Sequence, residues 1–132
     1  MQTFLPYPSF EQSARVLDYK RLGKQRVEGA QIINTLEGRS AGWANHPCVR
    51  MWDGYVDALK VYTNTMILEW THRRYRNNME LYVVEGEYEM PFWFGWNVVH
   101  RSHRASLLSK AYGYYSQYSW KELPINNIYW PV

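Results

Sequence analysis

SFEQSARVLDYKRLGKQRVEGAQIINTL, residues 9–36, is the longest helical pattern in the chain and predicts its organising element. Ser9 is suited to cap the helix, and Gln12, three residues later, would complete a capping box. At about 100° per residue, a set of apolar side chains falls on one side, which is the side that a globular protein buries. This set is Val16, Tyr19, Leu22, Val27, Ala30 and Ile33. We therefore expect one long amphipathic helix over 9–36.

Two arginines fall on the same side of this helix as the apolar residues. Arg15 and Arg26 would place guanidinium groups on a buried face, where the desolvation cost of several kcal/mol must be offset by an acid, by carbonyl groups or by a ligand phosphate. Arg26 is expected to be largely buried and hydrogen-bonded to an acid such as Glu28 or Asp18. A structural ion pair and a phosphate contact both remain open for these arginines.

A stripe of hydrogen-bonding side chains runs along one edge of the same helix. Its members are Asp18, Arg21, Gln25 and Glu28, at spacings of three, four and three residues. Side chains at such spacings are neighbours on a helix, so they can pair with one another for about 0.2–0.5 kcal/mol each. The alternative is that the stripe lines a polar pocket and binds a ligand.

Length and cysteine content limit the possible architectures. The chain has 132 residues, which suits a single domain over 1–132. The start of the chain lacks the features of a signal peptide, and no window reaches the roughly 18 apolar residues of a membrane span. We therefore expect an intracellular, cytoplasmic protein. Cys48 is the only cysteine, which excludes an internal disulfide or a cysteine-based zinc site, and it is expected to be a small buried hydrophobe.

The chain is basic and rich in aromatic residues. Its formal net charge is +3, and aromatic residues make up 17% of it, with seven Trp and twelve Tyr. Cations that bind phosphates and rings that stack on bases are typical of nucleic-acid binders. A small domain that packs its core with Tyr and Trp has the same composition, so the composition favours nucleic acid only modestly.

The remaining segments predict an all-α fold. Residues 1–8 carry two prolines and should form an extended arm. His46 and Pro47 resemble a helix start, and apolar residues recur at helical spacing beyond them. Residues 77–91 lose this periodicity and are expected to form a covering loop, whereas the aromatic tail after residue 119 should pack back across the helices. Three main helices are therefore expected, near 9–36, 46–74 and 102–116.

The segment HRSHR, residues 100–104, concentrates two imidazoles and two guanidiniums. His100 and His103 would share a helical face, but no third metal ligand is evident and the neighbouring arginines would repel a cation, so no metal site is expected. An anion site is one alternative, with Ser102 capping a helix and His103 and Arg104 reaching forward. Structural polar contacts are the other.

No Gly-rich phosphate loop, nucleophile elbow or metalloprotease helix is present in the sequence. Any catalysis must therefore use amines, carboxylates, imidazoles and arginines. Lys20 and Lys24 lie on the flank of the first expected helix, and a cation such as Arg21 could depress the pKa of a lysine amine enough to make it a Schiff-base nucleophile. Both lysines could equally be ordinary surface residues.

Four stretches of this sequence together resemble a known family. They are RLGKQRVEGAQ in the first expected helix, NHPCVRMWDGY at the start of the second, SHRASLLSK in the third and the aromatic tail. They resemble the pyrimidine-dimer DNA glycosylases of the endonuclease V type, and over nearly the whole chain they resemble the bacterial branch. The resemblance to the phage branch rests on Arg26-Val27, Gly29-Ala30, the helix after His46 and the tyrosine-rich end.

This resemblance implies a compact all-α fold of three helices without a metal or cofactor. It implies binding of duplex DNA across the minor groove, extrusion of a base, cleavage of the glycosidic bond through an imine, and strand cleavage by β-elimination. In the phage enzymes the nucleophile is the amine of a small N-terminal residue exposed by methionine removal, whereas the bulk of Gln2 should leave Met1 in place here. The family's catalytic glutamate corresponds to Leu22 and Gly23, and the nearest acid is Glu28.

Two functional hypotheses follow from the sequence. The first is a DNA glycosylase with AP-lyase activity on damaged pyrimidines, in which Glu28 is the acid/base and the amine of Met1 or Lys24 attacks the sugar. The second is a non-catalytic protein that binds a nucleotide, a flipped base or another phosphorylated small molecule in the same pocket. No obligatory protein partner is expected. The candidate phosphate and substrate contacts are Arg15, Asp18, Arg21, Gln25, Arg26, His46, His100, His103 and Arg104.

Overall fold

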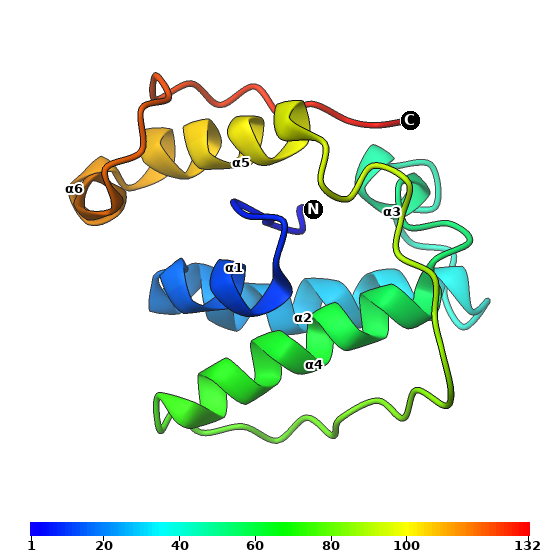
Figure 1. Ribbon diagram of the computed structural model, residues 1–132. Helices are drawn as coiled ribbons and strands as arrows, with labels where there is room; N and C mark the ends of the chain where they lie inside the picture. The colour runs from blue at the N-terminus through cyan, green and yellow to red at the C-terminus, as the bar shows by residue number, and fades with distance from the viewer.

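The computed structural model describes residues 1–132, and all regular secondary structure in it is helical. Figure 1 shows two layers, with α1, α2 and α4 below and α5, α6 and the C-terminal tail above, while α3 lies at one side. The all-α prediction is confirmed. The elements are α1 (Phe10–Val16), α2 (Tyr19–Leu36), α3 (Pro47–Arg50), α4 (Val56–His72), α5 (Asn97–Lys110), α6 (Tyr112–Tyr115) and a 3₁₀ turn, η1 (Ser116–Tyr118).

The first expected helix is two helices, so the prediction of one helix over 9–36 is wrong. Leu17 and Asp18 adopt extended backbone angles between α1 and α2. The Asp18 N–H donates to the Tyr115 hydroxyl at 3.0 Å, and this hydroxyl donates back to the Asp18 carboxylate. A short polar side chain that finds partners outside the helix favours such a break. The predicted cap at Ser9 is confirmed, because its hydroxyl accepts from the Gln12 N–H at 3.1 Å.

The predicted buried face is also wrong, because the break changes the helical phase of Arg15 relative to α2, and within α2 the buried face is turned away from Tyr19 and Val27. Tyr19 and Val27 are 53% and 45% exposed. The Arg15 side chain is 65% exposed and pairs with Glu11 at 3.6 Å, so its predicted place on the buried face is wrong. The face of α2 that is buried consists of Leu22, Gln25, Gly29, Ile32 and Ile33.

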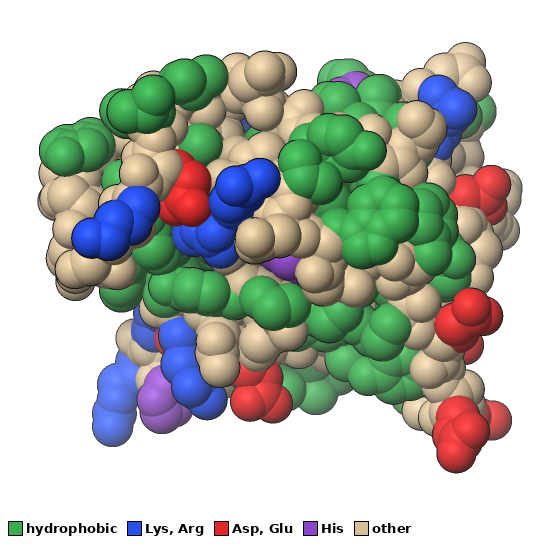
Figure 2. Space-filling model, turned by 45° about the horizontal axis from the view of Figure 1, so that its top comes forward, with side chains coloured by type: hydrophobic (Ala, Val, Ile, Leu, Met, Phe, Trp, Pro, Cys, Tyr) green, Lys and Arg blue, Asp and Glu red, His purple; other side chains and the backbone are tan.

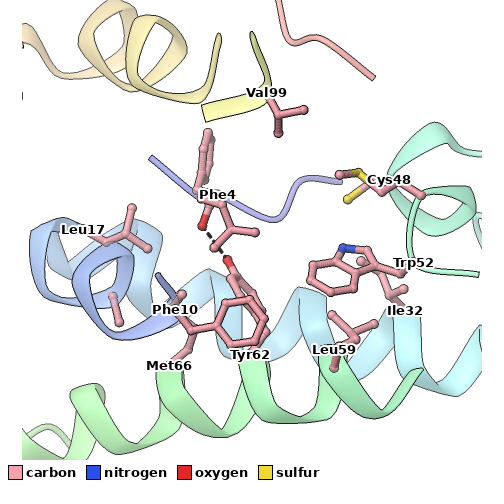
Figure 3. Packing of buried hydrophobic residues seen from close by; sticks show 14 of the residues in the cluster. Phe4, Phe10, Leu17, Ile32, Cys48, Trp52, Leu59, Tyr62, Met66 and Val99 are labelled. Carbon is pink, nitrogen blue, oxygen red and sulfur yellow. Dashed lines mark hydrogen bonds between the residues drawn. The ribbon is translucent and has the colours of Figure 1, made fainter. Parts of the chain in front are cut away.

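Helices α2 and α4 form the main helix pair of the lower layer. Gly29 permits their close approach, because a Cβ at this position would lie 2.2 Å from Thr63 Oγ1. Around this contact, 21 buried apolar residues form one cluster. Figure 3 shows part of it, with the rings of Phe10, Trp52 and Tyr62 packed between the helices.

The second and third expected helices are also interrupted. The predicted start of the second is right, because His46 Nδ1 accepts from the Cys48 N–H at 3.0 Å and Pro47 lies in the first turn. A turn with Gly54 at φ 87° then separates α3 from α4, so a continuous helix over 46–74 is wrong. Such a φ is costly for residues other than glycine and incompatible with a right-handed helix. Cys48 is buried, as predicted.

The third expected helix begins at Asn97 rather than near Ser102, and a break at Ala111 separates α5 from α6. Ser102 therefore lies inside α5, where its hydroxyl donates to the Val99 carbonyl at 2.8 Å and caps nothing. The C-terminal tail follows α5, as predicted, and Arg104 and Ser106 bond to Glu122 and Asn126 of the tail. Residues 77–91 form no helix or strand, which agrees with the predicted loop.

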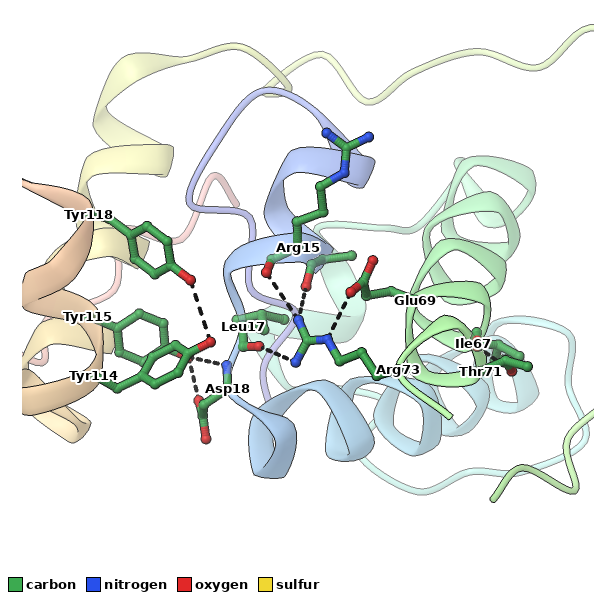
Figure 4. Close-up of polar contacts among 11 residues, drawn as sticks. Arg15, Leu17, Asp18, Ile67, Glu69, Thr71, Arg73, Tyr114, Tyr115 and Tyr118 are labelled. Carbon is green, nitrogen blue, oxygen red and sulfur yellow. Dashed lines mark hydrogen bonds and ion pairs between the residues drawn. The ribbon is translucent and has the colours of Figure 1, made fainter. Parts of the chain in front are cut away.

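Arg73, just after α4, ties α4 to the end of α1. Its guanidinium donates to the carbonyls of Leu17, Ala14 and Arg15 at 2.8, 3.0 and 3.1 Å, and its Nε pairs with Glu69 at 2.8 Å (Figure 4). The last carbonyls of a helix have no donor within the helix, and the Arg73 guanidinium supplies donors to those at the end of α1. None of the helices has the length and hydropathy needed to cross a membrane.

Candidate active site

The site is built on the extended arm, residues 1–8, which runs between the two helical layers (Figure 1). Thr3 and Leu5 are fully buried and Phe4 is 5% exposed. An extended chain inside a helical core has no strand to pair with, so side chains must satisfy its amides and carbonyls. The sequence predicts the extended conformation of this arm but not its burial.

Side chains from α2, α4 and α5 supply these hydrogen bonds. Gln25 accepts from the Phe4 N–H at 2.8 Å, and the Tyr62 hydroxyl donates to the Phe4 carbonyl at 2.9 Å (Figure 3). His103 Nδ1 accepts from the Leu5 N–H at 2.8 Å, and His100 Nδ1 lies 2.8 Å from the Leu5 carbonyl. The main chain of the arm is therefore held from both layers.

The structure contradicts the predicted anion site at the two histidines, because both rings are buried and contact the main chain of Leu5. His103 is fully buried, and His100 is 2% exposed. Burial lowers the pKa of His103 to about 3 and also lowers the pKa of His100. Both imidazoles are therefore neutral and face the arm. Arg104 is engaged as well, with the Pro6 carbonyl at 2.7 Å and with Glu122.

Glu28 lies where the arm begins. Its Oε2 accepts from the Gln2 N–H at 3.2 Å and from the Gln25 amide at 3.2 Å. Its Oε1 lies 4.0 Å from Lys24 Nζ, and its side chain is 13% exposed. The carboxylate is therefore bonded to the residue next to the N-terminal amine and has no arginine partner, unlike the structural ion pair that the sequence left open.

A pocket of about 350 Å³ opens at this carboxylate. Met1, Lys24 and Glu28, the three residues predicted to be catalytic, all line it, together with Arg21 and Gln25 of the polar stripe. The full lining is Met1, Gln2, Phe4, Lys20, Arg21, Lys24, Gln25, Glu28 and Lys110. Four basic side chains and the terminal amine around one carboxylate favour an anionic ligand.

Sequence reasoning missed Lys110, which comes from the end of α5 and reaches the same pocket. It also borders a second cavity of about 460 Å³, which shares Met1 and Gln2 with the first and is lined further by the tail residues Asn126, Asn127 and Trp130. The two cavities therefore meet at the N-terminus. No pattern in the sequence indicates this meeting, because it joins the two ends of the chain.

His46 lies near the same N-terminus. Burial and the charge of the terminal amine lower its pKa, while Glu28 opposes the shift. Because Nδ1 accepts from Cys48, the neutral ring carries its proton on Nε2. The ring stands edge-on to Trp43 and Trp130, with centroids at 5.8 and 5.6 Å. His46 is thus a helix cap that also stands beside the candidate site.

Arg26 lies outside the pocket. Its guanidinium stacks 4.3 Å from the centroid of the Trp70 ring, and Nη1 donates to the Asn77 side chain at 2.7 Å. Its Nε has no hydrogen-bond partner, and burial lowers its pKa. The predicted acid partner is therefore wrong. An indole face offsets part of the desolvation cost of a guanidinium, which is why no acid is needed.

The other candidate phosphate contacts are divided between different places. Arg21 lines the pocket and pairs with Asp18 at 3.2 Å, so the i,i+3 pairing expected within the stripe is present. Arg15 borders a separate cavity of about 570 Å³ between α1 and α4, which contains neither the terminal amine nor Glu28. The structure therefore brings Arg21 to the candidate site and leaves Arg15 and Arg26 elsewhere.

On one face of the protein, hydrophobic, basic and acidic side chains are largely segregated from one another. Figure 2 shows a broad hydrophobic patch on the face that bears α5, with Lys and Arg mostly to the left and Asp and Glu mostly to the right. Trp43, Phe92 and Trp96 are 59%, 58% and 43% exposed. Exposed aromatic rings are a feature of proteins that bind nucleic acid, where the rings stack on bases.

Comparison with known proteins identifies the family. A family model described as pyrimidine dimer DNA glycosylase matches residues 1–83, which include the arm, α2 and Glu28. No match was found among curated proteins or solved structures. The match covers more than half of the 132 residues, and it agrees with the resemblance carried by the motifs. The chain therefore belongs to the pyrimidine dimer DNA glycosylase family.

Proposed function

We propose that this protein binds duplex DNA, cleaves the glycosidic bond of a damaged pyrimidine such as one in a cyclobutane dimer, and then cleaves the strand as an AP lyase through an imine. One observation carries the proposal: the N-terminal residue, Lys24 and Glu28 line a single pocket with basic walls. An imine mechanism requires an amine next to an acid/base group, and phosphates on either side of the reacting sugar require cations.

Met1 is the amine that we favour as nucleophile. The next residue, Gln2, donates its N–H to Glu28 at 3.2 Å, so the terminal amine is held one residue away from the carboxylate. Lys24 Nζ lies 4.0 Å from the same carboxylate, but its side chain is 75% exposed. As a class, α-amines have pKa values about 2–3 units below those of lysine amines. A larger fraction of α-amines is therefore unprotonated at neutral pH.

The reaction begins when the unprotonated amine attacks the sugar C1′ and the glycosidic bond to the pyrimidine breaks. The pyrimidine takes the bonding electron pair and a proton, and in a cyclobutane dimer it stays joined to the neighbouring pyrimidine through the cyclobutane ring. Ring opening at O4′ then gives the imine between the amine nitrogen and C1′. Removal of a proton from C2′ expels the 3′ phosphate and cleaves the strand. Glu28 moves these protons and stabilises the cationic imine.

Borohydride trapping on a duplex that contains a cyclobutane dimer tests the proposal. Reduction of the imine joins the protein covalently to the DNA, so a shifted band is expected for the unaltered chain. Glu28→Gln should lower the rate by about 10²–10⁴-fold and spare binding, because it removes the proton-transfer group while keeping its size. Glu11→Gln is the matched control, since Glu11 borders the cavity at Arg15 and should not affect trapping.

The same assay separates the two amines. Lys24→Arg keeps the positive charge but cannot form an imine, so full trapping by this variant supports Met1 as nucleophile. One glycine added before Met1 should abolish trapping for a different reason, because it moves the terminal amine one residue further from Glu28, which holds the Gln2 N–H. Binding of the duplex without any trapped product would contradict the catalytic proposal and favour a non-catalytic binding protein.

A further inference from the structure

We propose that Gln25 is a positioning residue, which holds the N-terminal segment and the Glu28 carboxylate in register while Tyr62 fixes the orientation of its amide. This inference rests on the proposed function, because the amine and Glu28 are the groups that it aligns. It changes the expected role of Gln25, which the sequence placed among the groups that contact substrate.

All polar atoms of the Gln25 side chain are engaged inside the protein. Its Nε2 donates to the Gln2 carbonyl at 2.9 Å and to Glu28 Oε2 at 3.2 Å. Its Oε1 accepts from the Phe4 N–H at 2.8 Å and from the Tyr62 hydroxyl at 2.5 Å. An amide with two donated and two accepted hydrogen bonds has no group left for a substrate. Gln25 is also only 1% exposed.

The orientation of this amide is fixed by its neighbours. The Phe4 N–H can only donate, so the atom facing it must be Oε1, and Nε2 must face the Gln2 carbonyl and Glu28. The Tyr62 hydroxyl reaches both Oε1 and the Phe4 carbonyl, and its proton is shared between these two acceptors. Tyr62 is fully buried and does not line the pocket, so it holds the amide from within the core.

The Gln25 amide links the Glu28 carboxylate to the N-terminal segment. One NH₂ group contacts both the carboxylate and the main chain of the second residue, so a rotation of the amide would move Glu28 and the terminal amine relative to each other. A misplacement of about 1 Å between reacting groups can cost about 10²-fold in rate. Gln25 therefore limits the separation between nucleophile and acid/base without touching the substrate.

Two substitutions at Gln25 and one at Tyr62 test this role. Gln25→Met keeps the length but removes all four hydrogen bonds, and the saturating rate of imine trapping should fall at least about tenfold while the DNA dissociation constant changes less than about twofold. Gln25→Glu adds a carboxylate beside Glu28, which should move the acidic limb of the pH–rate profile to higher pH. Tyr62→Phe should lower the rate without moving that limb. Gln31→Glu, on the exposed face of α2, should change neither the rate nor the profile.

Amide hydrogen exchange supplies a readout that does not depend on activity. In Gln25→Met the Phe4 amide should exchange at least about tenfold faster, while amides in the centre of α4 keep their protection. A Gln25→Met variant with unchanged trapping rate and unchanged Phe4 exchange would overturn the inference. If Gln25→Met does not fold, a Tyr62→Phe variant with unaltered rate would overturn it instead. Absence of trapping in the unaltered chain would contradict the proposed function, and the Phe4 exchange would still decide the role of Gln25.

Discussion

Two extended segments of this protein lack helix and strand, yet one lies in the core and the other covers the surface. In the arm, Thr3 and Leu5 are completely buried. In residues 77–91, Leu81 and Val83 are 49% and 78% exposed. Both segments contain apolar residues, so hydrophobicity alone does not explain the difference.

The hydrogen bonds of the main chain explain it. The arm is bonded by Gln25, Tyr62, His100, His103 and Arg104, which come from three helices. Residues 77–91 are held to the helices chiefly by Asn64, which bonds the N–H and carbonyl of Tyr82 at 2.8 and 2.9 Å, and by the Arg26 contact to Asn77. Extended chain can enter a helical core only where side chains replace the partners that a neighbouring strand would give.

The largest expected effect is at Leu5. Leu5→Ala should destabilise the protein by about 2–5 kcal/mol, because it removes buried methyl groups and leaves a cavity between the layers. Urea unfolding monitored by circular dichroism measures the change. A loss below about 1 kcal/mol would show that the arm contributes little to the core and would remove the contrast between the two segments.

The second largest effect is expected from acidification, which should lower the free energy of unfolding by protonating the two histidines that hold the arm. The pKa values of His100 and His103 are lowered in the folded state, so the unfolded state binds more protons at mildly acidic pH. Their contribution is complete above the unfolded pKa near 6.5 and is lost as the pH falls towards the folded value of about 3 for His103. The free energy of unfolding should fall by up to about 1.4 kcal/mol per pH unit for each histidine.

Unfolding curves between pH 7 and pH 4 measure this loss, and a matched pair of variants assigns it. His103→Asn can still accept from the Leu5 N–H, and it should lower the stability at pH 7 while reducing the pH dependence. His72→Asn, at the exposed end of α4, should leave the pH dependence unchanged. Equal pH dependence in the two variants would mean that the buried imidazoles do not cause the acid loss.

A smaller effect is expected where residues 77–91 attach to α4. Asn64→Ala removes both bonds to the Tyr82 main chain and should cost about 1–2 kcal/mol, because the net contribution of a hydrogen bond is about 0.5–1.5 kcal/mol. Limited proteolysis should then cut residues 77–91 faster while the arm stays protected. Faster cleavage within the arm instead would show that the two segments are coupled.

The smallest effect is expected at Val83. Its side chain is 78% exposed, so Val83→Ala should change the free energy of unfolding by less than about 0.5 kcal/mol. Thermal unfolding of both Val83→Ala and Leu5→Ala, measured under the same conditions, compares their losses of stability directly. A loss comparable to that of Leu5→Ala would indicate that residues 77–91 bury Val83 in solution.

The sequence by itself determines the helical class, the capped starts at Ser9 and His46, and the grouping of Arg21, Gln25 and Glu28 on one edge of α2. These features depend on local spacing and capping, which act between residues a few positions apart. The family model matches residues 1–83, which contain RLGKQRVEGAQ and NHPCVRMWDGY. Lys24 could also be proposed from the sequence, because amines were among the remaining catalytic groups, whereas Met1 was implied by the family resemblance.

Only the tertiary structure decided the break at Asp18, the outward position of Arg15, the contact of Arg26 with Trp70 and the role of the two histidines. Leu5 and His103 are 98 residues apart, and Asp18 and Tyr115 are 97 apart. Helical periodicity gives the direction of a side chain relative to its own helix, but the partner depends on how distant segments pack. A histidine that binds a buried main chain and one that binds phosphate therefore have the same local sequence pattern, and burial separates them.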